Sequence, residues 1–317
     1  PPERLPGIIA NASALGLWPE ALDLLEHLSD VRRGPVADVV AEQSPDVVRG
    51  LVDAVSAAGI WESLLPVVGV MSEQARFSLA ASPAFHEPRV LGEIIQAAAA
   101  ASQWAQLLPL IDALPDEVRR VAADLVAELD EQSVGALVTA VSAGQLWPRL
   151  LPVVRTMSEP SRTAMAAMAP FHADSVLKEI LAAAADSGLW IDLVPLLRVL
   201  PDAVFARVPA LVVDLPVDSL TAIVTEAVES AEILEPFLDL LTRMDAASLD
   251  RVVALIDSEH AALGEILIGA VIERPDVRRV FDQLPPDVLE AVERAAVRLG
   301  LSADLAQARA TGEPERK

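Results

Sequence analysis

The sequence contains no cysteine and no tyrosine, and aromatic residues make up only 3% of its 317 residues. Without cysteine the chain can form neither disulfides nor thiolate metal sites, and it has no cysteine nucleophile. No HExxH, P-loop or GxSxG pattern occurs among the remaining residues. We therefore expect no metal and no cofactor, and we favour a protein that is not an enzyme.

Positive charge is also scarce, because 24 Lys and Arg face 47 Asp and Glu and the net charge is −23. This balance argues against binding to nucleic acid and to anionic membrane surfaces. The longest uncharged run, residues 94–111, contains polar residues and Pro109, so we interpret it as a buried helix and not as a membrane span. No apolar signal segment opens the chain, which favours a cytoplasmic location. Since the chain starts at Pro1 without an initiator methionine, we expect it to be either trimmed or a piece of a longer one.

What is abundant is aliphatic sequence arranged in a repeat. Hydrophobic residues make up 53% of the chain, and the mean hydropathy is +0.41. All five tryptophans are separated by steps of 43 residues, and a series of prolines keeps the same step. Self-similarity at this period indicates a repeat architecture. The two series, which we interpret as a structural signature, are Trp18, Trp61, Trp104, Trp147 and Trp190, and Pro66, Pro109, Pro152 and Pro195.

Each unit has the pattern of three short helices. The first has apolar residues at helical spacing and ends near a glycine two residues before the tryptophan, as at Gly16, Gly59 and Gly188, where glycine suits a left-handed cap. The second starts just after the tryptophan and carries the internal proline, which we expect to kink it. The third starts with a capping residue and an acid. No segment alternates with period two, so the sequence predicts an all-α fold without a sheet.

In period and helix count the chain resembles armadillo and HEAT repeats. This resemblance implies a right-handed α-solenoid of about seven three-helix repeats in a single domain over residues 1–300. We expect a polar tail over residues 301–317. The armadillo Asn ladder that clamps extended peptides is not found. The expected units are 1–43, 44–86, 87–129, 130–172, 173–215, 216–256 and 257–300.

A second period of 86 residues covers two units. The third helix of the even units is poor in charge and rich in Ala, Ser, Met and Phe, and it ends in Phe-His. One interpretation is an apolar binding patch on the inner face of the solenoid. The other is ordinary packing between units. A metal shared by the two histidines is disfavoured, because equivalent positions two units apart lie roughly 20 Å from each other. The candidate binding residues are Phe77, Leu79, Phe85, His86, Met165, Met168, Phe171 and His172.

The leading hypothesis is a non-catalytic scaffold that presents an apolar concave groove to a protein partner or to a second copy of itself. One alternative is a carrier that encloses a hydrophobic small molecule, such as a lipid or an isoprenoid, in a strongly curved array. Another is an enzyme in which acidic residues converge in an apolar cavity, since burial can raise the pKa of a carboxyl into the range of general acids.

Overall fold

The computed structural model describes residues 5–257, 262–274, 277 and 283–310. The chain is 82% helical, and no strand occurs in these described ranges, so the prediction of an all-α fold is confirmed. The chain divides into two compact units, Pro1–Phe171 and His172–Lys317. Residues 311–317, the end of the expected tail, lie outside the described residues.

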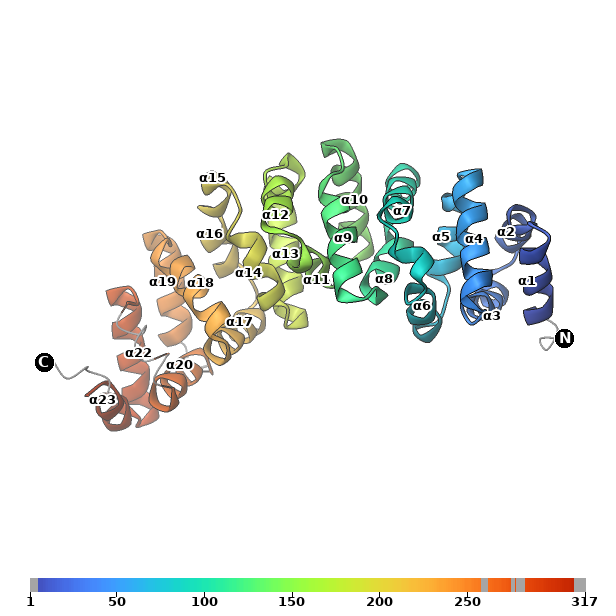
Figure 1. Cartoon of the computed structure of the whole chain (residues 1–317). Helices are drawn as coiled ribbons and strands as arrows, with labels where there is room; N and C mark the ends of the chain where they lie inside the picture. The colour runs from blue at the N-terminus through green and yellow to red at the C-terminus, as the bar shows by residue number, and fades with distance from the viewer. Residues whose placement is uncertain (1–4, 258–261, 275–276, 278–282, 311–317) are drawn as a thin grey trace, which may run out of the picture. The chain divides into compact units, whose positions relative to one another are not determined.

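The first unit is a succession of short helices joined by tight turns (Figure 1). The even-numbered sequence repeats differ from the odd ones, because their third helix is shorter and is followed by a turn of 3₁₀ helix. The elements are α1 (Leu5–Ala14), α2 (Trp18–Glu26), α3 (Asp30–Ala41), α4 (Pro45–Ala58), α5 (Trp61–Gly69), α6 (Glu73–Ala80), η2 (Pro83–His86), α7 (Pro88–Ala101), α8 (Trp104–Ala113), α9 (Asp116–Ala127), α10 (Glu131–Gly144), α11 (Trp147–Thr156) and α12 (Glu159–Ala166), with η3 (Ala169–His172) at the unit boundary.

Helices one sequence period apart pack against each other in this unit. The first helices form the row α1, α4, α7 and α10, and the second helices form the row α2, α5, α8 and α11. Among the third helices, α3 contacts α6 and α9 contacts α12. The first and second helices therefore pack against their counterparts in the next repeat, and the third helices do so in pairs, which is compatible with a helical repeat.

The tryptophans hold the start of each second helix in the core. Each is the first residue of its helix, one position earlier than expected, and each is at most 3% exposed. The internal proline lies half-buried in the middle of the same helix. Because a proline has no amide N–H, Pro66 leaves the carbonyl of Glu62 without its helical donor. The side-chain amide of Gln103, at the start of α8, donates to that carbonyl at 3.0 Å and so links two repeats.

The predicted left-handed caps are confirmed at Gly16, Gly59 and Gly188, whose φ angles are 69°, 66° and 64°. Two other repeats have no glycine at this position, yet Ser102 and Gln145 adopt φ angles of 55° and 52°. Left-handed backbone is unfavourable for residues with a Cβ atom. The conformation at this corner is therefore imposed by the packing of the two helices on either side of it.

Two aspartates join neighbouring third helices. The Oδ1 atom of Asp38 on α3 accepts a hydrogen bond from the backbone N–H of Ser72, at the start of α6, at 2.8 Å. Asp124 on α9 makes the same bond to Ser158, at the start of α12, also at 2.8 Å. Each carboxylate satisfies a backbone donor at a helix N-terminus, where the helix dipole favours negative charge.

The second unit continues the helical pattern with two changes. The third helix of its first repeat is broken around Arg207, before Pro209, and a helix, α23, occupies part of the stretch expected to be a polar tail. The tail expectation is wrong for residues 302–310, because Leu305 and Ala308 are buried and α23 packs against α20 and α22. The elements are α13 (Asp174–Ser187), α14 (Trp190–Leu197), α15 (Asp202–Phe205), α16 (Val208–Val213), α17 (Val217–Glu229), α18 (Ala231–Thr242), α19 (Ala246–Asp257), α20 (Ala262–Glu273), α22 (Pro286–Leu299) and α23 (Ser302–Ala310).

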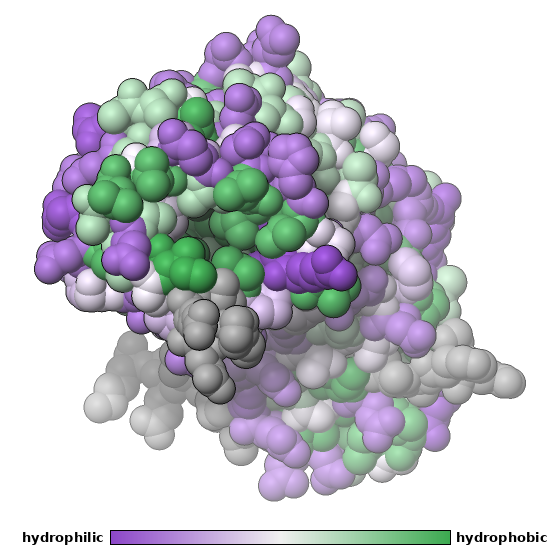
Figure 2. Space-filling model, turned by 90° about the vertical axis from the view of Figure 1, so that its right-hand side faces the viewer, coloured by the Kyte–Doolittle hydropathy of each residue, from purple (hydrophilic) through white to green (hydrophobic). Residues whose placement is uncertain are grey.

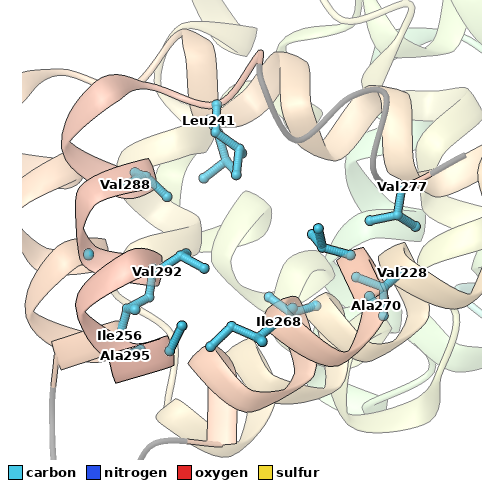
Figure 3. Packing of buried hydrophobic residues seen from close by; sticks show 14 of the residues in the cluster. Val228, Leu241, Ile256, Ile268, Ala270, Val277, Val288, Val292 and Ala295 are labelled. Carbon is cyan, nitrogen blue, oxygen red and sulfur yellow. The ribbon is translucent and has the colours of Figure 1, made fainter. Parts of the chain in front are cut away.

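The core of this unit is aliphatic. Figure 3 shows Ile256, Ile268, Val292 and Ala295 directed toward one another from α19, α20 and α22. These helices bring together Val, Ile, Leu and Ala side chains with little exposure. Burial of apolar area is therefore the main term that holds this unit together.

Candidate functional site

The structure separates the eight candidate binding residues into two groups. Leu79, Phe85, Met165 and Phe171 are at most 1% exposed. The prediction that these four side chains belong to a free binding surface is wrong, because they are core residues. Phe85, for example, lies edge-on to Trp61 with the ring centroids 6.4 Å apart. For these four the alternative interpretation, packing between helices, is the correct one.

The other four candidates have different surroundings. The Nε2 atom of His86 lies 2.9 Å from the carbonyl oxygen of Ala80, so this histidine closes the turn after α6. His172 is partly buried, and its carbonyl accepts a hydrogen bond from Arg207 at 2.7 Å. Met168 is also partly buried. Phe77 is the member of the set that is well exposed, at 48%.

Phe77 lies in a groove of about 420 Å³ formed by three helices of the first unit. It projects from α6, while α8 contributes Pro109 and Asp112 and α11 contributes Pro148 and Arg149. The prolines are half-buried, and the adjoining faces of α8 and α11 are in contact. An exposed aromatic ring beside two proline rings forms an apolar surface that a partner side chain can cover.

Charges of both signs border this groove. Glu73 on α6 and Asp112 on α8 are carboxylates, and Arg149 on α11 is a cation. None of the three side chains has a hydrogen bond or an ion pair with the described part of the chain. In contrast, Arg76 is held in place, because its Nη1 atom donates to the carbonyl of Met71. The groove therefore offers an apolar centre and three charged groups that a ligand can pair with.

Arg76 belongs to a further series with the 43-residue period, which the sequence patterns described above do not include. Arg33, Arg76, Arg119 and Arg162 are separated by steps of 43 residues. Each guanidinium donates to carbonyls at the end of the preceding second helix; Arg119, for example, reaches the carbonyls of Asp112 and Leu114 at 2.8 and 3.0 Å. A cation at a helix C-terminus satisfies orphan carbonyls and favours the helix dipole. We call these four residues the arginine clamps.

A polar cluster connects the second and third repeats of the sequence. The Glu93 carboxylate accepts hydrogen bonds from the Ser56 hydroxyl, from the Trp61 indole at 3.0 Å and from Arg89 at 2.6 Å. Desolvation raises the pKa of Glu93, but the hydrogen bonds from Ser56, Trp61 and Arg89 outweigh it, so the pKa lies below its usual value. Such a carboxylate stays ionised and has a structural role.

Glu226 on α17 has the opposite electrostatics. Desolvation raises its pKa; the hydrogen bond from the backbone N–H of Trp190 opposes this, and the charges of Asp192 and Glu229 raise it further. The enzyme alternative rests on carboxyls of this kind. Among the described residues, no three His, Asp or Glu side chains are arranged so that they could hold a metal ion.

Glu226→Gln is expected to stabilise the second unit at neutral pH. A raised pKa in the folded state means that ionisation of Glu226 opposes folding. The wild-type unit is therefore most stable while Glu226 is protonated, below its unfolded-state pKa near 4.5, and it loses stability as the pH rises through the folded-state pKa. The gain over the wild type should be absent at low pH and level off above the folded pKa. Urea unfolding from about pH 4 to about pH 8 measures it.

The matched variant is Glu93→Gln, for which the sign reverses. A lowered pKa gives stability that is present above the unfolded value and is lost as the pH falls through the folded value. Glu93→Gln should therefore be less stable than the wild type at neutral pH, and the difference should shrink in acid. Parallel pH profiles for the two variants would contradict both assignments.

The end of the first unit formed by α1, α2 and α3 has a further apolar surface. Figure 2 looks onto this end and shows apolar side chains gathered on it. Leu24 is 69% exposed here, whereas Val67, one period later on α5, is 1% exposed. Ile8 and Leu24 therefore occupy positions that the next repeat buries, at Leu51 and Val67. The exposed large hydrophobic residues of this end are Ile8, Leu15, Leu17, Leu24 and Val31.

No single helix in the described part of the chain is long and apolar enough to cross a membrane, although the helix pair 202–213 and 217–229, bent by 116°, passes a length and composition test when taken together. The chain matches no family model, and neither the curated proteins nor the solved structures include a significant match. The likeness to armadillo and HEAT repeats therefore remains one of period and helix count.

Proposed function

We propose that this chain is a non-catalytic helical-repeat scaffold that binds a protein partner in the groove between α6, α8 and α11. The observation that carries the proposal is Phe77, an aromatic side chain left 48% exposed in a groove shared by three consecutive repeats. Aromatic side chains, phenylalanine included, are enriched in the cores of protein–protein interfaces relative to the rest of the surface.

The charges around the groove support a partner segment that combines an apolar and a basic side chain. The apolar side chain covers Phe77, Pro109 and Pro148, and the basic one pairs with Glu73 or Asp112. The net charge of −23 increases the rate of association with a basic partner. Since Glu73 and Asp112 have no partner within the described part of the chain, pairing with them breaks no existing contact.

The finer architecture belongs to the same proposal. We infer a solenoid of armadillo or HEAT type, because helices one period apart pack against each other within each unit, and the resemblance to those repeats implies that it is right-handed. In such an array consecutive second and third helices form a continuous ridge and groove surface. The groove around Phe77 is one segment of that surface.

The groove is tested by site-specific photo-crosslinking in the native host. A photoreactive phenylalanine analogue at position 77 should form an adduct with a polypeptide partner. The matched control carries the same analogue at Thr163, which is exposed at the equivalent place 86 residues later on α12. Equal adducts at both positions, or none at position 77, would contradict the proposal.

The affinity for the partner found in this way gives the second measurement. Phe77→Ala should weaken binding by roughly 30-fold, since a central aromatic anchor contributes about 2 kcal/mol or more. Thr163→Ala should leave the affinity unchanged. Native mass spectrometry completes the test, because extra mass from a bound apolar small molecule that is lost on denaturation would favour the carrier alternative over the scaffold.

A further inference from the structure

The series of arginine clamps stops at Arg162, because the residue 43 positions later, in the second compact unit, is Phe205. Phe205 is the fourth residue of α15, and Arg119 is the fourth residue of α9. The two residues are therefore in the same position of their helices. The groups that receive the guanidinium of Arg119 have counterparts around Phe205.

The receiving groups are all retained in sequence. Arg119 donates to the carbonyls of Asp112 and Leu114 and lies 3.6 Å from the carboxylate of Asp116. The residues 86 positions later are Arg198, Leu200 and Asp202. They supply two backbone carbonyls and a carboxylate in the same order.

The backbone that presents these groups is retained as well. Pro115 and Pro201, which precede the two helices, have φ and ψ angles of −54° and 147°, and −54° and 141°. The turn before them is closed by Leu114 N–H to Ile111 at 3.1 Å, and by Leu200 N–H to Leu197 at 3.3 Å. The carbonyls and the carboxylate around Phe205 are thus oriented as in the arginine clamp of Arg119.

A cavity of about 310 Å³ lies at this place, lined by Arg198, Leu200, Asp202 and Phe205, by Asp239 of α18 and by Arg243, which follows α18. In the described part of the chain, nothing donates a hydrogen bond to the carbonyls of Arg198 and Leu200 or pairs with Asp202. Arg243 does not replace the missing clamp, because it pairs with Asp239 at 3.0 Å and lies over the Phe205 ring at 4.8 Å.

We infer that this cavity binds an arginine side chain of a partner protein. A guanidinium has five donors in a plane, which suits two carbonyls and a carboxylate. The chain itself shows the fit, since its own arginines occupy the equivalent place in four earlier repeats. The site is separate from the groove around Phe77 and does not depend on it.

An anion is the competing ligand, because Arg198 and Arg243 also line the cavity. The geometry disfavours it. Arg243 is already neutralised by Asp239, and the carbonyls of Arg198 and Leu200 and the Asp202 carboxylate present only acceptor atoms, which repel a negative group. The net charge of −23 also favours a cationic side chain.

The test uses the full chain, labelled with ¹⁵N, and follows its amide signals by NMR. N-acetyl-arginine amide is titrated to about 50 mM, because a single side chain binds in the millimolar range. Shifts should centre on the amides of Leu200, Asp202 and Phe205. N-acetyl-citrulline amide, which has the same shape without the charge, should bind at least about tenfold more weakly.

Two variants decide whether the cavity is the site. Phe205→Arg should restore the chain's own clamp, abolish the arginine shifts and raise the melting temperature. Asp202→Asn keeps Phe205 and should weaken binding by roughly tenfold, while Asp116→Asn, in the clamp that is already filled, should not change it. No saturable shifts, equal binding of citrulline, or stronger shifts with acetate at the same amides would overturn the inference.

Discussion

Replacing Phe85 by alanine is expected to lower the free energy of unfolding by about 3–5 kcal/mol, because a fully buried aromatic ring is removed and a cavity is left behind. Phe85 is 0% exposed, and its ring lies against Trp61, which is itself buried. The loss therefore reaches the start of α5 as well as the turn after α6. Urea unfolding followed by circular dichroism measures it, with the midpoint of the first transition as the readout.

Phe77→Ala is the matched control for this experiment. Phe77 and Phe85 have the same side chain and are eight residues apart, but Phe77 is half-exposed. Its replacement should change stability by less than about 0.5 kcal/mol. If both variants lose the same stability, the separation of this segment into a buried part and an exposed part is wrong.

Arg119→Met is expected to cost about 2 kcal/mol, which makes the arginine clamps the largest polar contribution to stability that we predict. Hydrogen bonds that involve a charged group contribute about 1.5–3 kcal/mol each, and partial exposure reduces this. Methionine keeps the aliphatic stem but leaves the carbonyls of Asp112 and Leu114 without their donor. Chemical denaturation of the purified variant checks the value.

The neighbouring residue provides the control. Arg120 has the same charge and is exposed, and it makes no hydrogen bond or ion pair with the described residues. Arg120→Met should therefore be nearly neutral. A cost for Arg120→Met as large as that for Arg119→Met would show that the effect comes from net charge and not from the carbonyls at the end of α8.

The fold could be predicted from the sequence because tryptophan, a rare residue, recurs with the 43-residue period of the repeat. Each tryptophan is the first residue of a second helix and is buried, so the five positions were enough to locate five of these helices. Gly16, Gly59 and Gly188 marked the ends of the first helices through their need for positive φ. Ser102 and Gln145 could not be identified in this way, because their conformation is imposed by the neighbouring helices.

The site was harder to predict, for a physical reason. A helix rich in Ala, Ser, Met and Phe can face a core or a partner, and its composition does not distinguish the two. In α6 the core takes Leu79, while Phe77, two residues earlier, projects on another side of the helix into the groove. The arginine clamps were not predicted, because one arginine per repeat does not stand out among the other charged residues of the third helices, as a tryptophan does.

The aspartate bonds between third helices have a consequence for how such a chain can lengthen or shorten. Asp38 and Asp124 each accept from a serine N–H, whereas the intermediate positions hold Ala81 and Ala167, whose counterparts in sequence are Pro115 and Pro201. Between residues 38 and 201 the acceptor and the donor are therefore present together or absent together. In this stretch, losing 43 residues would place an aspartate against a proline, whereas losing 86 would again pair an aspartate with a serine. We therefore expect this part of the chain to change its length by pairs of repeats.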